Sequence, residues 1–397
     1  MDIISELDGK RILIWGYGRE GKATEHFLER CVKPASVDIF EGKREEINED
    51  AYDFIIKSPG IVMKEENPKY TSETELFLQQ FRDQVIGITG TKGKSTTSAM
   101  LYTVLKACSG RPVLLLGNIG QPCLDYFEEV TEDTIIVYEM SCHQLAHTNV
   151  SPHIAIFLNL YEEHLDYYGT VEKYFEAKSH IAAYQKSGDF FFVGENVPKI
   201  ETKAEKTVLH QPKDVHYKLR LAGEHNQYDA QFVEHVAELL GCEKEAVLKS
   251  MAEFEGLPHR LQYIGTYRGV RYFDDSISTI PEAAINAAMS IPDAKTILIG
   301  GMDRGINYDL LITFIREHRE FQFICAYASG KRIFGEVGDC ENCVYVEDLE
   351  QAVEAAVQMT EPGGACILSP AAASYGYFKN FEERGEAFQK YVYAFAQ

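Results

Sequence analysis

One segment of thirteen residues constrains the fold of this chain more than any other: Val85–Thr97, which reads VIGITGTKGKSTT. Its first four residues predict a short buried strand, and the residues from Lys94 onward predict a helix. The glycines in between supply the backbone freedom that a sharp turn needs. Backbone N–H groups and the helix dipole favour an anion at such a helix start, while Lys94 and Ser95 suit outer phosphates and a magnesium ion. The segment therefore predicts a nucleotide-binding loop made of Gly90, Thr91, Lys92, Gly93, Lys94, Ser95 and Thr96.

Composition limits the classes of protein that this chain can belong to. Its 397 residues are enough for two or three domains, and 45% hydrophobic with 25% charged residues is typical of a globular protein. A net charge of −22 argues against nucleic acid as a partner but allows small phosphorylated substrates. The nine cysteines are interpreted as reduced thiols, with neither a zinc site nor a disulfide framework. An acidic N-terminus and the lack of a long apolar run predict a cytoplasmic protein with no membrane partner.

The N-terminal region predicts a small βαβ unit with a second glycine-rich turn. A strand at Arg11–Trp15 is followed by GYGREG at residues 16–21 and a helix over residues 22–30, with further strands at 37–40 and 54–56. This pattern is typical of dinucleotide-binding folds, so a nicotinamide- or flavin-dependent oxidoreductase with Asp38 or Glu41 on the ribose is one interpretation. In the other, the glycines only allow close packing, with a different ligand or none at the turn.

The middle region predicts further parallel strands, each followed by polar residues. Strands at 113–116, 134–138 and 154–158 lead into Asn118, Glu139, Asn159 and His164. Ligands collect at the carboxyl ends of parallel strands, so we expect these side chains near the phosphate loop. Glu139 is then a candidate magnesium ligand, because hard cations prefer oxygen; a solvated loop carboxylate is the alternative. On the helix that follows, Lys178 either faces the site or belongs to an exposed surface.

The rest of the chain predicts a second and a third α/β domain. Residues 187–208 give no clear pattern, helices are expected at 229–240 and 245–254, and Gly256-Leu257-Pro258 marks a boundary. Beyond it, strands at 270–273, 296–299, 323–328, 343–346 and 366–368 alternate with helices at 282–290, 309–317, 349–360 and 381–394. The predicted fold class is α/β, with a Rossmann-like domain at 1–83, a P-loop ATPase-type domain at 84–255 and a Rossmann-like domain at 256–397.

The motifs together resemble those of the Mur ligases, ATP-dependent enzymes that form amide bonds in the peptidoglycan stem peptide. The similarity extends over nearly the whole chain. The marks of the family are Gly90–Thr96, Gly117–Gly120, Asn159 with His164-Leu165-Asp166, Lys178, His225-Asn226 and Pro258–Arg260. Those of the branch that adds glutamate are Gly256–Arg260, Leu368–Ser374 and Phe378–Gly385.

The resemblance implies two small-molecule substrates, UDP-N-acetylmuramoyl-L-alanine and D-glutamate. We also expect a monomer, although the sequence itself does not determine the oligomeric state. Residues implied to bind the UDP-linked substrate are Gly18, Glu41, Lys43, Gly60, Asn118, Ser141, Gln144 and His164. Residues implied to bind ATP, besides the phosphate loop, are Asn226, Asp229, Arg260 and Asp275. Residues implied to bind the incoming amino acid are Thr279, Arg304, Ser374 and Phe381.

The resemblance also implies the chemistry. ATP phosphorylates the substrate carboxylate, and the amino group attacks the acyl-phosphate through a tetrahedral intermediate. The implied catalytic residues are Lys94, Glu139, His164 and Lys178, and the implied ligands of two Mg²⁺ ions are Ser95, Glu139, His164 and Lys178. In this interpretation Lys178 is an N-carbamate, which turns a cation into a carboxylate-like ligand.

Three positions depart from the pattern of the branch. Ile277 stands where a lysine is usual, Ile280 where an asparagine is usual, and Asp229 replaces an asparagine near the adenine. Loss of a cation beside a pocket for a dicarboxylic amino acid has to be compensated, for instance by Arg304. L-glutamate or another amino acid therefore stays open as the added group, while the reaction class is unaffected.

Overall fold

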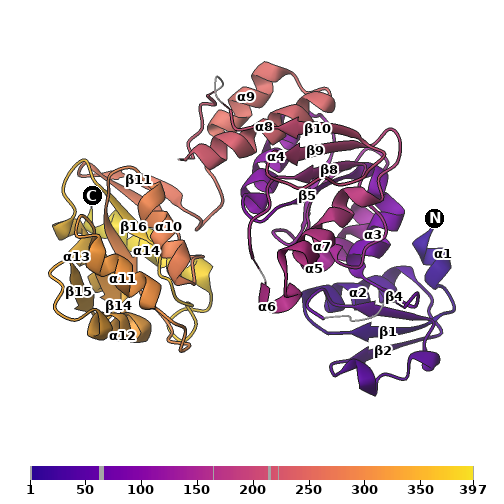
Figure 1. The fold of residues 1–397 in the computed structure, drawn as a ribbon, viewed down its shortest axis with the longest axis horizontal. Helices are drawn as coiled ribbons and strands as arrows, with labels where there is room; N and C mark the ends of the chain where they lie inside the picture. The colour runs from indigo at the N-terminus through magenta and orange to yellow at the C-terminus, as the bar shows by residue number, and fades with distance from the viewer. Residues whose placement is uncertain (1, 62–66, 164, 213–215, 222, 397) are drawn as a thin grey trace. The chain divides into compact units, whose positions relative to one another are not determined.

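The computed structural model describes residues 2–61, 67–163, 165–212, 216–221 and 223–396, which form three sheets one after another along the chain (Figure 1). The described residues divide into two compact units. One comprises Met1–Leu219 and Glu224–Glu253, and the other comprises Arg220–Gly223 and Phe254–Gln397. No helix among these residues is both long and apolar enough to span a membrane. The first unit holds the first two sheets and the second unit holds the third.

The first sheet has the strand order β2-β1-β3-β4, all parallel. Its strands are β1 (Arg11–Trp15), β2 (Ser36–Phe40), β3 (Phe54–Lys57) and β4 (Tyr70–Thr71), and its helices are α1 (Ile3–Leu7), α2 (Arg19–Cys31) and α3 (Glu73–Phe81). Helix α2 begins three residues before the predicted start because Gly18 caps it. A Cβ on Gly21 would lie 2.2 Å from the Gly16 carbonyl oxygen, so only glycine lets α2 approach the turn this closely.

The second sheet contains the predicted phosphate loop at its centre. Its strands are β5 (Val85–Thr89), β6 (Val113–Gly117), β7 (Ile135–Glu139), β8 (Ile154–Phe157), β9 (Phe190–Gly194) and β10 (Glu205–Leu209), in the parallel order β10-β9-β8-β5-β7-β6. Its helices are α4 (Lys94–Cys108), α5 (Cys142–Leu145), α6 (Leu165–Tyr168), α7 (Val171–Ala183), α8 (Glu224–Leu239) and α9 (Lys244–Glu253). Since β7 and β8 flank β5, the segments that follow all three strands meet at one edge of the sheet.

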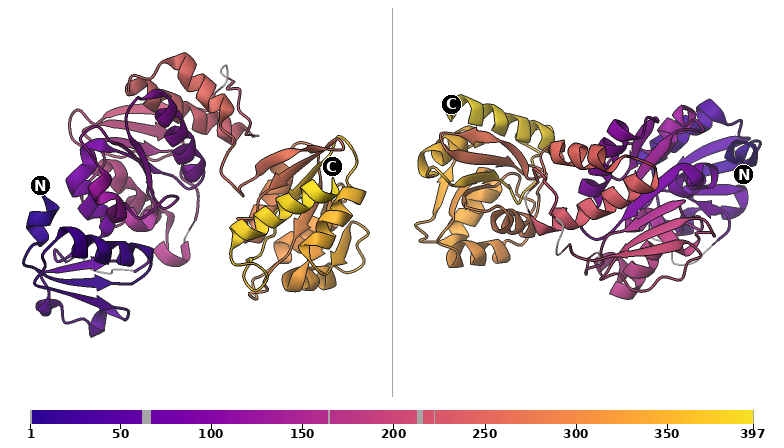
Figure 2. Two further views of the ribbon diagram at one scale, coloured as in Figure 1. Left: turned by 180° about the vertical axis from the view of Figure 1, so that it is seen from behind. Right: turned by 90° about the horizontal axis from the view of Figure 1, so that it is seen from above.

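The third sheet has the order β11-β12-β16-β13-β14-β15, in which only β11 is antiparallel. Its strands are β11 (Gln262–Tyr267), β12 (Val270–Asp274), β13 (Ala294–Ile299), β14 (Gln322–Ala326), β15 (Cys343–Val346) and β16 (Ala365–Leu368). Its helices are α10 (Pro281–Ser290), α11 (Asp309–Glu317), α12 (Tyr327–Val337), α13 (Leu349–Met359) and α14 (Phe381–Phe395), and Figure 2 shows α14 along one face of the sheet. Alternate residues of β13 enter different buried clusters, Ile297 with α10–α12 and Leu298 with α13 and α14, so helices cover both faces.

The α/β class with mainly parallel sheets is confirmed, whereas several local predictions differ from the structure. The unassigned residues 187–208 hold β9 and all but the last residue of β10. Strand β9 is a buried inner strand, whereas β10 is an edge strand whose charged residues hide the strand pattern. Strand β14 ends at Ala326 instead of 328, because helix α12 begins at Tyr327. Each sheet lies within one of the predicted ranges 1–83, 84–255 and 256–397; the domain boundaries themselves stay predictions.

The cysteines need one correction. Cys340 and Cys343 have a Cys-x-x-Cys spacing, which the interpretation of all nine cysteines as reduced thiols without a zinc site did not consider. Both thiols are buried and free, and the Cys343 Sγ lies 3.4 Å from the Cys325 Sγ of the neighbouring strand. Among the described residues no group of three or more His, Cys, Asp and Glu side chains could hold a metal.

A stability measurement can test whether β9 is part of the core. Phe191 lies in β9 and is fully buried, so Phe191→Ala is expected to lower the free energy of unfolding of the first unit by ~3 kcal/mol through lost burial and a cavity. Val208 in β10 is 43% exposed, and Val208→Ala is expected to change that free energy by less than ~0.5 kcal/mol. Urea unfolding would show both values, and equal effects would contradict the assignment.

Candidate active site

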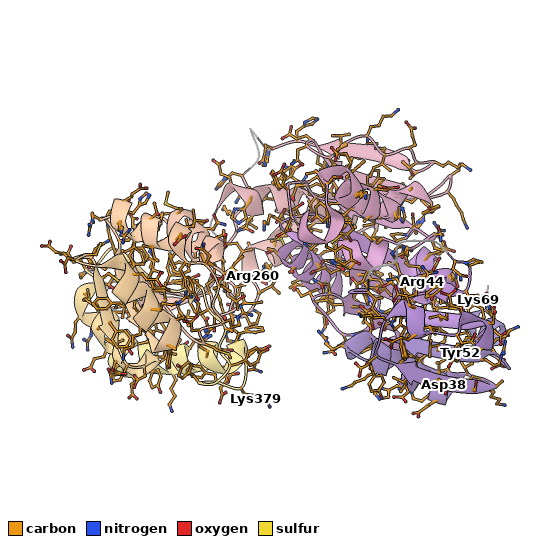
Figure 3. All side chains as sticks on the ribbon, turned by 60° about the horizontal axis from the view of Figure 1, so that its bottom comes forward. Asp38, Arg44, Tyr52, Lys69, Arg260 and Lys379 are labelled. Carbon is orange, nitrogen blue, oxygen red and sulfur yellow. The ribbon has the colours of Figure 1, made fainter. Side chains whose placement is uncertain are left out.

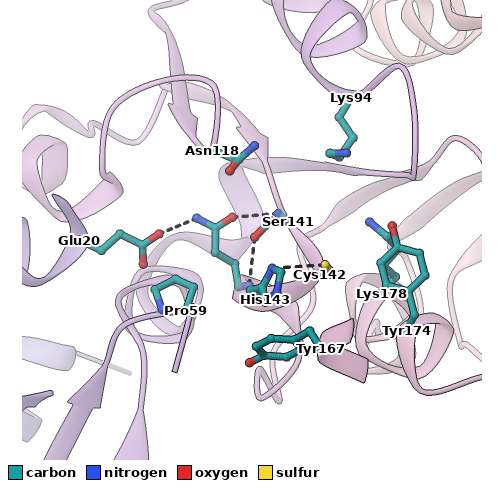
Figure 4. A pocket seen from close by; sticks show the side chains of 12 residues that line it. Glu20, Pro59, Lys94, Asn118, Ser141, Cys142, His143, Tyr167, Tyr174 and Lys178 are labelled. Carbon is teal, nitrogen blue, oxygen red and sulfur yellow. Dashed lines mark hydrogen bonds between the residues drawn. The ribbon is translucent and has the colours of Figure 1, made fainter. Parts of the chain in front are cut away.

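A cavity of about 460 Å³ lies in the first unit, where the loops of the first and second sheets meet (Figure 4). Its lining comes from the α2 start, the turn after β3, the phosphate loop, and the segments after β6 and β7 with α7. The lining residues are Glu20, Pro59, Gly60, Lys94, Asn118, Ser141, Cys142, His143, Gln144, Tyr167, Tyr174 and Lys178. The cavity thus gathers six residues that sequence reasoning selected from separate stretches of the chain: Gly60, Lys94, Asn118, Ser141, Gln144 and Lys178.

The phosphate loop has a built-in support. All five residues of β5 are buried, and Gly93 caps α4 with φ of +85°, a conformation that favours glycine. Asn159, at the end of the neighbouring strand β8, holds the loop through three hydrogen bonds. Its side-chain oxygen accepts from the Lys92 N–H at 2.9 Å, its carbonyl accepts from the Thr91 N–H at 3.0 Å, and its amide donates to the Lys92 carbonyl at 3.0 Å. Asn159 therefore shapes the loop.

Two lysines meet at one carbonyl of this loop. The Lys94 Nζ donates to the carbonyls of Gly90 and Thr91, at 3.0 Å each. The Lys178 Nζ donates to the same Gly90 carbonyl at 2.8 Å and to the Thr89 Oγ1 at 3.2 Å. Lys178 is only 1% exposed, so the alternative of a solvated lysine is wrong. Burial, and next the charge of Lys94, lower the pKa of Lys178 to about 7; burial also lowers the pKa of Lys94, against the charge of Glu139.

Glu139 ends β7 with its side chain fully buried, which excludes the solvated-loop alternative. Its Oε1 accepts a hydrogen bond from the Asn118 Nδ2 at 2.7 Å. Its Oε2 is also buried and has no hydrogen-bond partner among the described residues. An orphaned carboxylate oxygen suits a hard cation such as magnesium, so the residues present fit the metal that the sequence predicts. His164, the other predicted side-chain ligand besides Ser95 and Lys178, lies outside the described residues.

Helix α8 brings a further acid to the phosphate loop. Asp229 is 2% exposed, and its carboxyl lies so close to Gly93 that a Cβ there would be 2.5 Å from the Asp229 Oδ2. Burial raises the pKa of Asp229 to about 8, so this acid carries a proton at neutral pH. Asn226, one turn earlier on α8, is buried as well. Both residues, predicted to bind ATP, lie on this helix, and the approach to Gly93 places Asp229 beside the loop.

The predicted UDP-binding residues fall into two groups. Gly60 lines the cavity with Asn118, Ser141 and Gln144, whereas Gly18 caps α2 and is exposed. Glu41 and Lys43 are exposed in the turn after β2, outside the cavity lining.

Neighbouring side chains of the first sheet are engaged with one another. Burial raises the pKa of the Tyr52 phenol, and hydrogen bonding to the Asp38 carboxylate raises it further (Figure 3). The Arg44 guanidinium lies over the Tyr70 ring at 5.2 Å and pairs with Glu49 at 3.0 Å.

The second unit holds the predicted ribose and amino-acid residues. Asp275 is 4% exposed and accepts hydrogen bonds from the Leu261 N–H at 3.1 Å, the Ser278 Oγ at 2.5 Å and the Ser369 Oγ at 2.7 Å. Burial raises the pKa of Asp275 to about 6 against these bonds. The remaining positions range from buried to exposed: Ser374 is buried, Thr279 and Phe381 are half-buried, and Arg304 is exposed. Arg260 is exposed as well (Figure 3).

Sequence reasoning assigned no role to two prominent residues. Arg384 is 1% exposed and donates to the Ser276 Oγ at 3.0 Å, the Ser276 carbonyl at 2.7 Å and the Ala372 carbonyl at 3.0 Å. It therefore ties together the loops after β12 and β16, and its place in the quoted Phe378–Gly385 motif was the available signal. Glu20 in the first unit lines the cavity, and an acid inside a glycine-rich phosphate-type turn was the signal there.

Comparison with known proteins gives consistent results at the level of sequence. The model of the Mur ligase middle domain matches residues 88–235. The chain is 30% identical to the UDP-N-acetylmuramoylalanine--D-glutamate ligase of Aquifex aeolicus, over 96% of this chain and 98% of the relative. It is 31% identical to the protein of the same name from Geobacillus kaustophilus, over 92% of this chain and 89% of the relative.

Solved structures show the same fold. The crystal structure of UDP-N-acetylmuramate-alanine ligase MurC from Thermotoga maritima has a TM-score of 0.61 at 16% identity, and covers 97% of this chain and 99% of its own. The MurF ligase of the same organism, solved in complex with ADP, has a TM-score of 0.60 at 16% identity, and covers 98% of this chain and 96% of its own. At this identity the likeness concerns the fold alone.

The pKa of Lys178 has a consequence for stability. It lies at about 7 in the folded chain, below the value of about 10.4 expected when unfolded. Between these pH values the unfolded chain binds the extra proton, so the Lys178 contribution to the free energy of unfolding rises with pH. Urea unfolding in carbon-dioxide-free buffer can compare the free energies of unfolding of wild type and Lys178→Met. From pH 7 to pH 10 the stability of the wild type is expected to rise relative to Lys178→Met by a few kcal/mol, on the order of the pKa gap. The exposed Lys106→Met on α4 serves as the control, and parallel curves for wild type and Lys178→Met would contradict the assignment.

Proposed function

The chain belongs to the Mur ligase family and is an ATP-dependent amino-acid ligase, and we propose that it adds D-glutamate to UDP-N-acetylmuramoyl-L-alanine in peptidoglycan precursor synthesis. The observation that carries the proposal is the meeting of Lys94, Lys178 and the orphaned Glu139 oxygen at the phosphate loop. The curated relatives, aligned over nearly the whole chain, supply the substrate and the amino acid. Membership of a ligase family removes the basis for the oxidoreductase interpretation.

The reaction joins a carboxylate to an amine, which requires activation of the carboxylate. Transfer of the ATP γ-phosphoryl group to the carboxylate of the alanyl residue gives an acyl-phosphate and ADP. The amino group then attacks the acyl carbon, and the tetrahedral intermediate expels inorganic phosphate. In this scheme the Lys94 ammonium leaves its own loop carbonyls for the outer phosphates, which offer it a full negative charge instead of two dipoles.

Magnesium would supply the charge neutralisation that brings the γ-phosphoryl group and the acceptor carboxylate together. Ser95 and the free Glu139 oxygen would hold one ion. His164 and a carboxylated Lys178 would hold a second ion. Because the described residues offer no cluster of three ligating side chains, the phosphates and water would complete both coordination shells.

Lys178 is suited to carboxylation by its surroundings. A pKa of about 7 leaves a large fraction of the amine uncharged at neutral pH, and only the uncharged amine can attack carbon dioxide. The nitrogen forms a bond to carbon, a proton leaves, and the product is a carbamate that carries one negative charge. The change would convert mutual repulsion between Lys178 and Lys94 into attraction.

Each predicted domain would contribute one reactant. Gly18 and Gly60, with Glu41 and Lys43, would hold the UDP moiety, while Asn118, Ser141 and Gln144 would contact the muramoyl-alanine portion. Asn226 and Asp229 on α8 would approach the adenine.

The second unit would bind further groups of ATP and the incoming amino acid. Arg260 would reach the ATP phosphates and Asp275 the ribose. Thr279, Arg304, Ser374 and Phe381 would receive the amino acid.

The loop around Thr279 offers some support for an amino acid other than D-glutamate as the acceptor. Ile277 is half-buried and Ile280 is 50% exposed, so the loop around Thr279 presents apolar surface where the branch has a lysine and an asparagine. Arg304 is exposed and available as the compensating cation for an acidic side chain. D-glutamate is the primary proposal, and L-glutamate or another amino acid is the second.

An amino-acid panel tests the proposal. With UDP-N-acetylmuramoyl-L-alanine and Mg-ATP, phosphate release is expected to be fastest with D-glutamate, because it alone fits both the cation and the stereochemistry of the relatives' product. Equal or faster release with L-glutamate or another amino acid would transfer the assignment to the second candidate. No release with any acceptor would contradict the ligase.

Two lysines of α4 provide the control for that panel. Lys94→Ala is expected to reduce phosphate release to background with every amino acid, because the outer phosphates lose their cation. Lys106→Ala, on the same helix but exposed beside Tyr102, is expected to keep the wild-type rate. Matching losses in both variants would indicate a folding defect.

Carboxylation of Lys178 can be observed directly. Protein equilibrated with ¹³C-bicarbonate is expected to show one carbamate carbon resonance in the wild type and none in Lys178→Arg. Activity is expected to fall when carbon dioxide is removed and to return with bicarbonate. A fully active wild type that lacks the resonance would contradict the carbamate.

A further inference from the structure

Two acidic side chains, Glu20 and Glu73, lie against each other inside the first unit. Glu20 belongs to the first turn of α2, directly after the glycine-rich turn, and Glu73 is the first residue of α3. Glu73 is 2% exposed, and its Oε1 accepts a hydrogen bond from the Leu124 N–H at 2.9 Å. Both side chains line the same small cavity of about 100 Å³, and hydrogen bonding between the two carboxyl groups influences the pKa of each. Such a pair needs an explanation, because two buried carboxylates repel.

A proton shared between the two carboxyl groups would explain the pair, because one Glu20 oxygen otherwise lacks a hydrogen-bond donor in the part of the chain that the structure describes. The Glu20 Oε1 accepts from the Gln144 Nε2 at 2.8 Å. The Glu20 Oε2 is buried and finds no donor among the described residues when both acids are ionised. A proton on Glu73 turns that carboxyl into a donor for Glu20 and removes the repulsion in the same step. Glu73 is the more deeply buried acid, and its pKa is raised by that burial and then by the charge of Glu20.

The charged and titratable neighbours favour this placement of the proton. Lys57, at the end of β3, is 3% exposed and attracts the Glu20 carboxylate, as does Arg19. Burial is nevertheless the largest influence on Glu20 and raises its pKa. On the other side, Glu73 faces the Cys123 thiol and the Tyr138 phenol, both uncharged, and the phenol donates to the Cys123 Sγ at 3.2 Å. The negative charge therefore belongs on Glu20 and the proton on Glu73.

The pair is connected to the floor of the cavity through Gln144. While the Gln144 amide donates to Glu20, its Oε1 accepts from the Ser141 N–H at 2.8 Å, and its own N–H donates to the Ser141 Oγ at 3.2 Å (Figure 4). These bonds form the capping box that starts α5, two residues after Glu139. Glu20, Ser141 and Gln144 all line the cavity. The orientation of the Gln144 amide thus depends on an acid from the other sheet.

We propose that Glu73 carries a proton that it donates to Glu20, and that this carboxyl pair positions Gln144 and the Ser141 turn for the UDP-linked substrate. The first half stands on the structure alone, and the second half rests on the proposed function. Both acids are positioning residues, since they act through Gln144. When Glu73 loses its proton at alkaline pH, it repels Glu20, the bond to Gln144 breaks, and affinity for the UDP-linked substrate falls as pH rises.

The variant Glu73→Gln keeps the size and the hydrogen bonds of the Glu73 side chain but removes its titratable proton. Its amide can donate to Glu20 and accept from Leu124, and it cannot ionise. We expect the KM for UDP-N-acetylmuramoyl-L-alanine to rise several-fold toward alkaline pH in the wild type and to stay flat in Glu73→Gln. We expect Glu20→Ala to raise that KM about tenfold with little change in the KM for ATP, as for loss of one hydrogen bond to a charged group.

Glu75 provides a matched control on the same helix. It is 7% exposed and burial raises its pKa, but its carboxylate accepts from the Asn149 N–H and from Thr71, away from the cavity. We expect Glu75→Gln to keep the wild-type pH profile. An alkaline rise in Glu73→Gln equal to that of the wild type, or loss of the rise in Glu75→Gln, would overturn the positioning role while leaving the ligase function intact.

Infrared spectroscopy tests the proton without any substrate. At pH 7 the wild type is expected to show the carbonyl stretch of a buried protonated carboxyl that is missing in Glu73→Gln and retained in Glu75→Gln. Absence of that difference between wild type and Glu73→Gln would overturn the shared proton. If the wild type did not bind the UDP-linked substrate at all, the proposed function and the positioning role would fail together, and the infrared result would still decide the proton.

Discussion

The active site depends on the Gly90 carbonyl, which accepts hydrogen bonds from both Lys94 and Lys178. Two ammonium groups at one acceptor would repel each other. Burial, and next the charge of the half-buried Lys94, lower the pKa of Lys178 to about 7, so a large fraction of this amine is uncharged at neutral pH. The fold imposes the arrangement. Gly90 follows the central strand β5, and α7 places the Lys178 Nζ within hydrogen-bonding distance of the Gly90 carbonyl. A bound triphosphate would attract Lys94 away from the Gly90 carbonyl, and a negatively charged, carboxylated Lys178 would attract the Lys94 ammonium.

Much of this arrangement was predictable from the sequence. A strand, a glycine-rich turn and a helix start are local features, so Val85–Thr97 predicted both its fold and its ligand class. The position of Glu139 was predictable as well, because parallel topology places every strand end at one edge of the sheet. Its complete burial, its bond to Asn118 after β6 and its orphaned oxygen were not, since they depend on how segments distant in sequence pack together.

Other features were out of reach because they depend on contacts distant in sequence. Glu20 is marked in the sequence only as an acid within a glycine-rich turn; its partners Glu73 and Gln144 lie 53 and 124 positions away. Asn159 looked like one more strand-end residue, whereas its three bonds support the phosphate loop. Strand β10 was missed because an edge strand with exposed Glu205 and Lys206 lacks the apolar alternation that marks a half-buried strand.

The central claim is that the phosphate loop presents the γ-phosphoryl group of ATP to a carboxylate of the substrate. The most direct test uses UDP-N-acetylmuramoyl-L-alanine labelled with ¹⁸O in its alanyl carboxylate, with mass analysis of the products after one turnover with D-glutamate. The account predicts one ¹⁸O atom in the released inorganic phosphate, because the acyl-phosphate breaks at its carbon–oxygen bond. Label in AMP, or release of unlabelled phosphate, would contradict it.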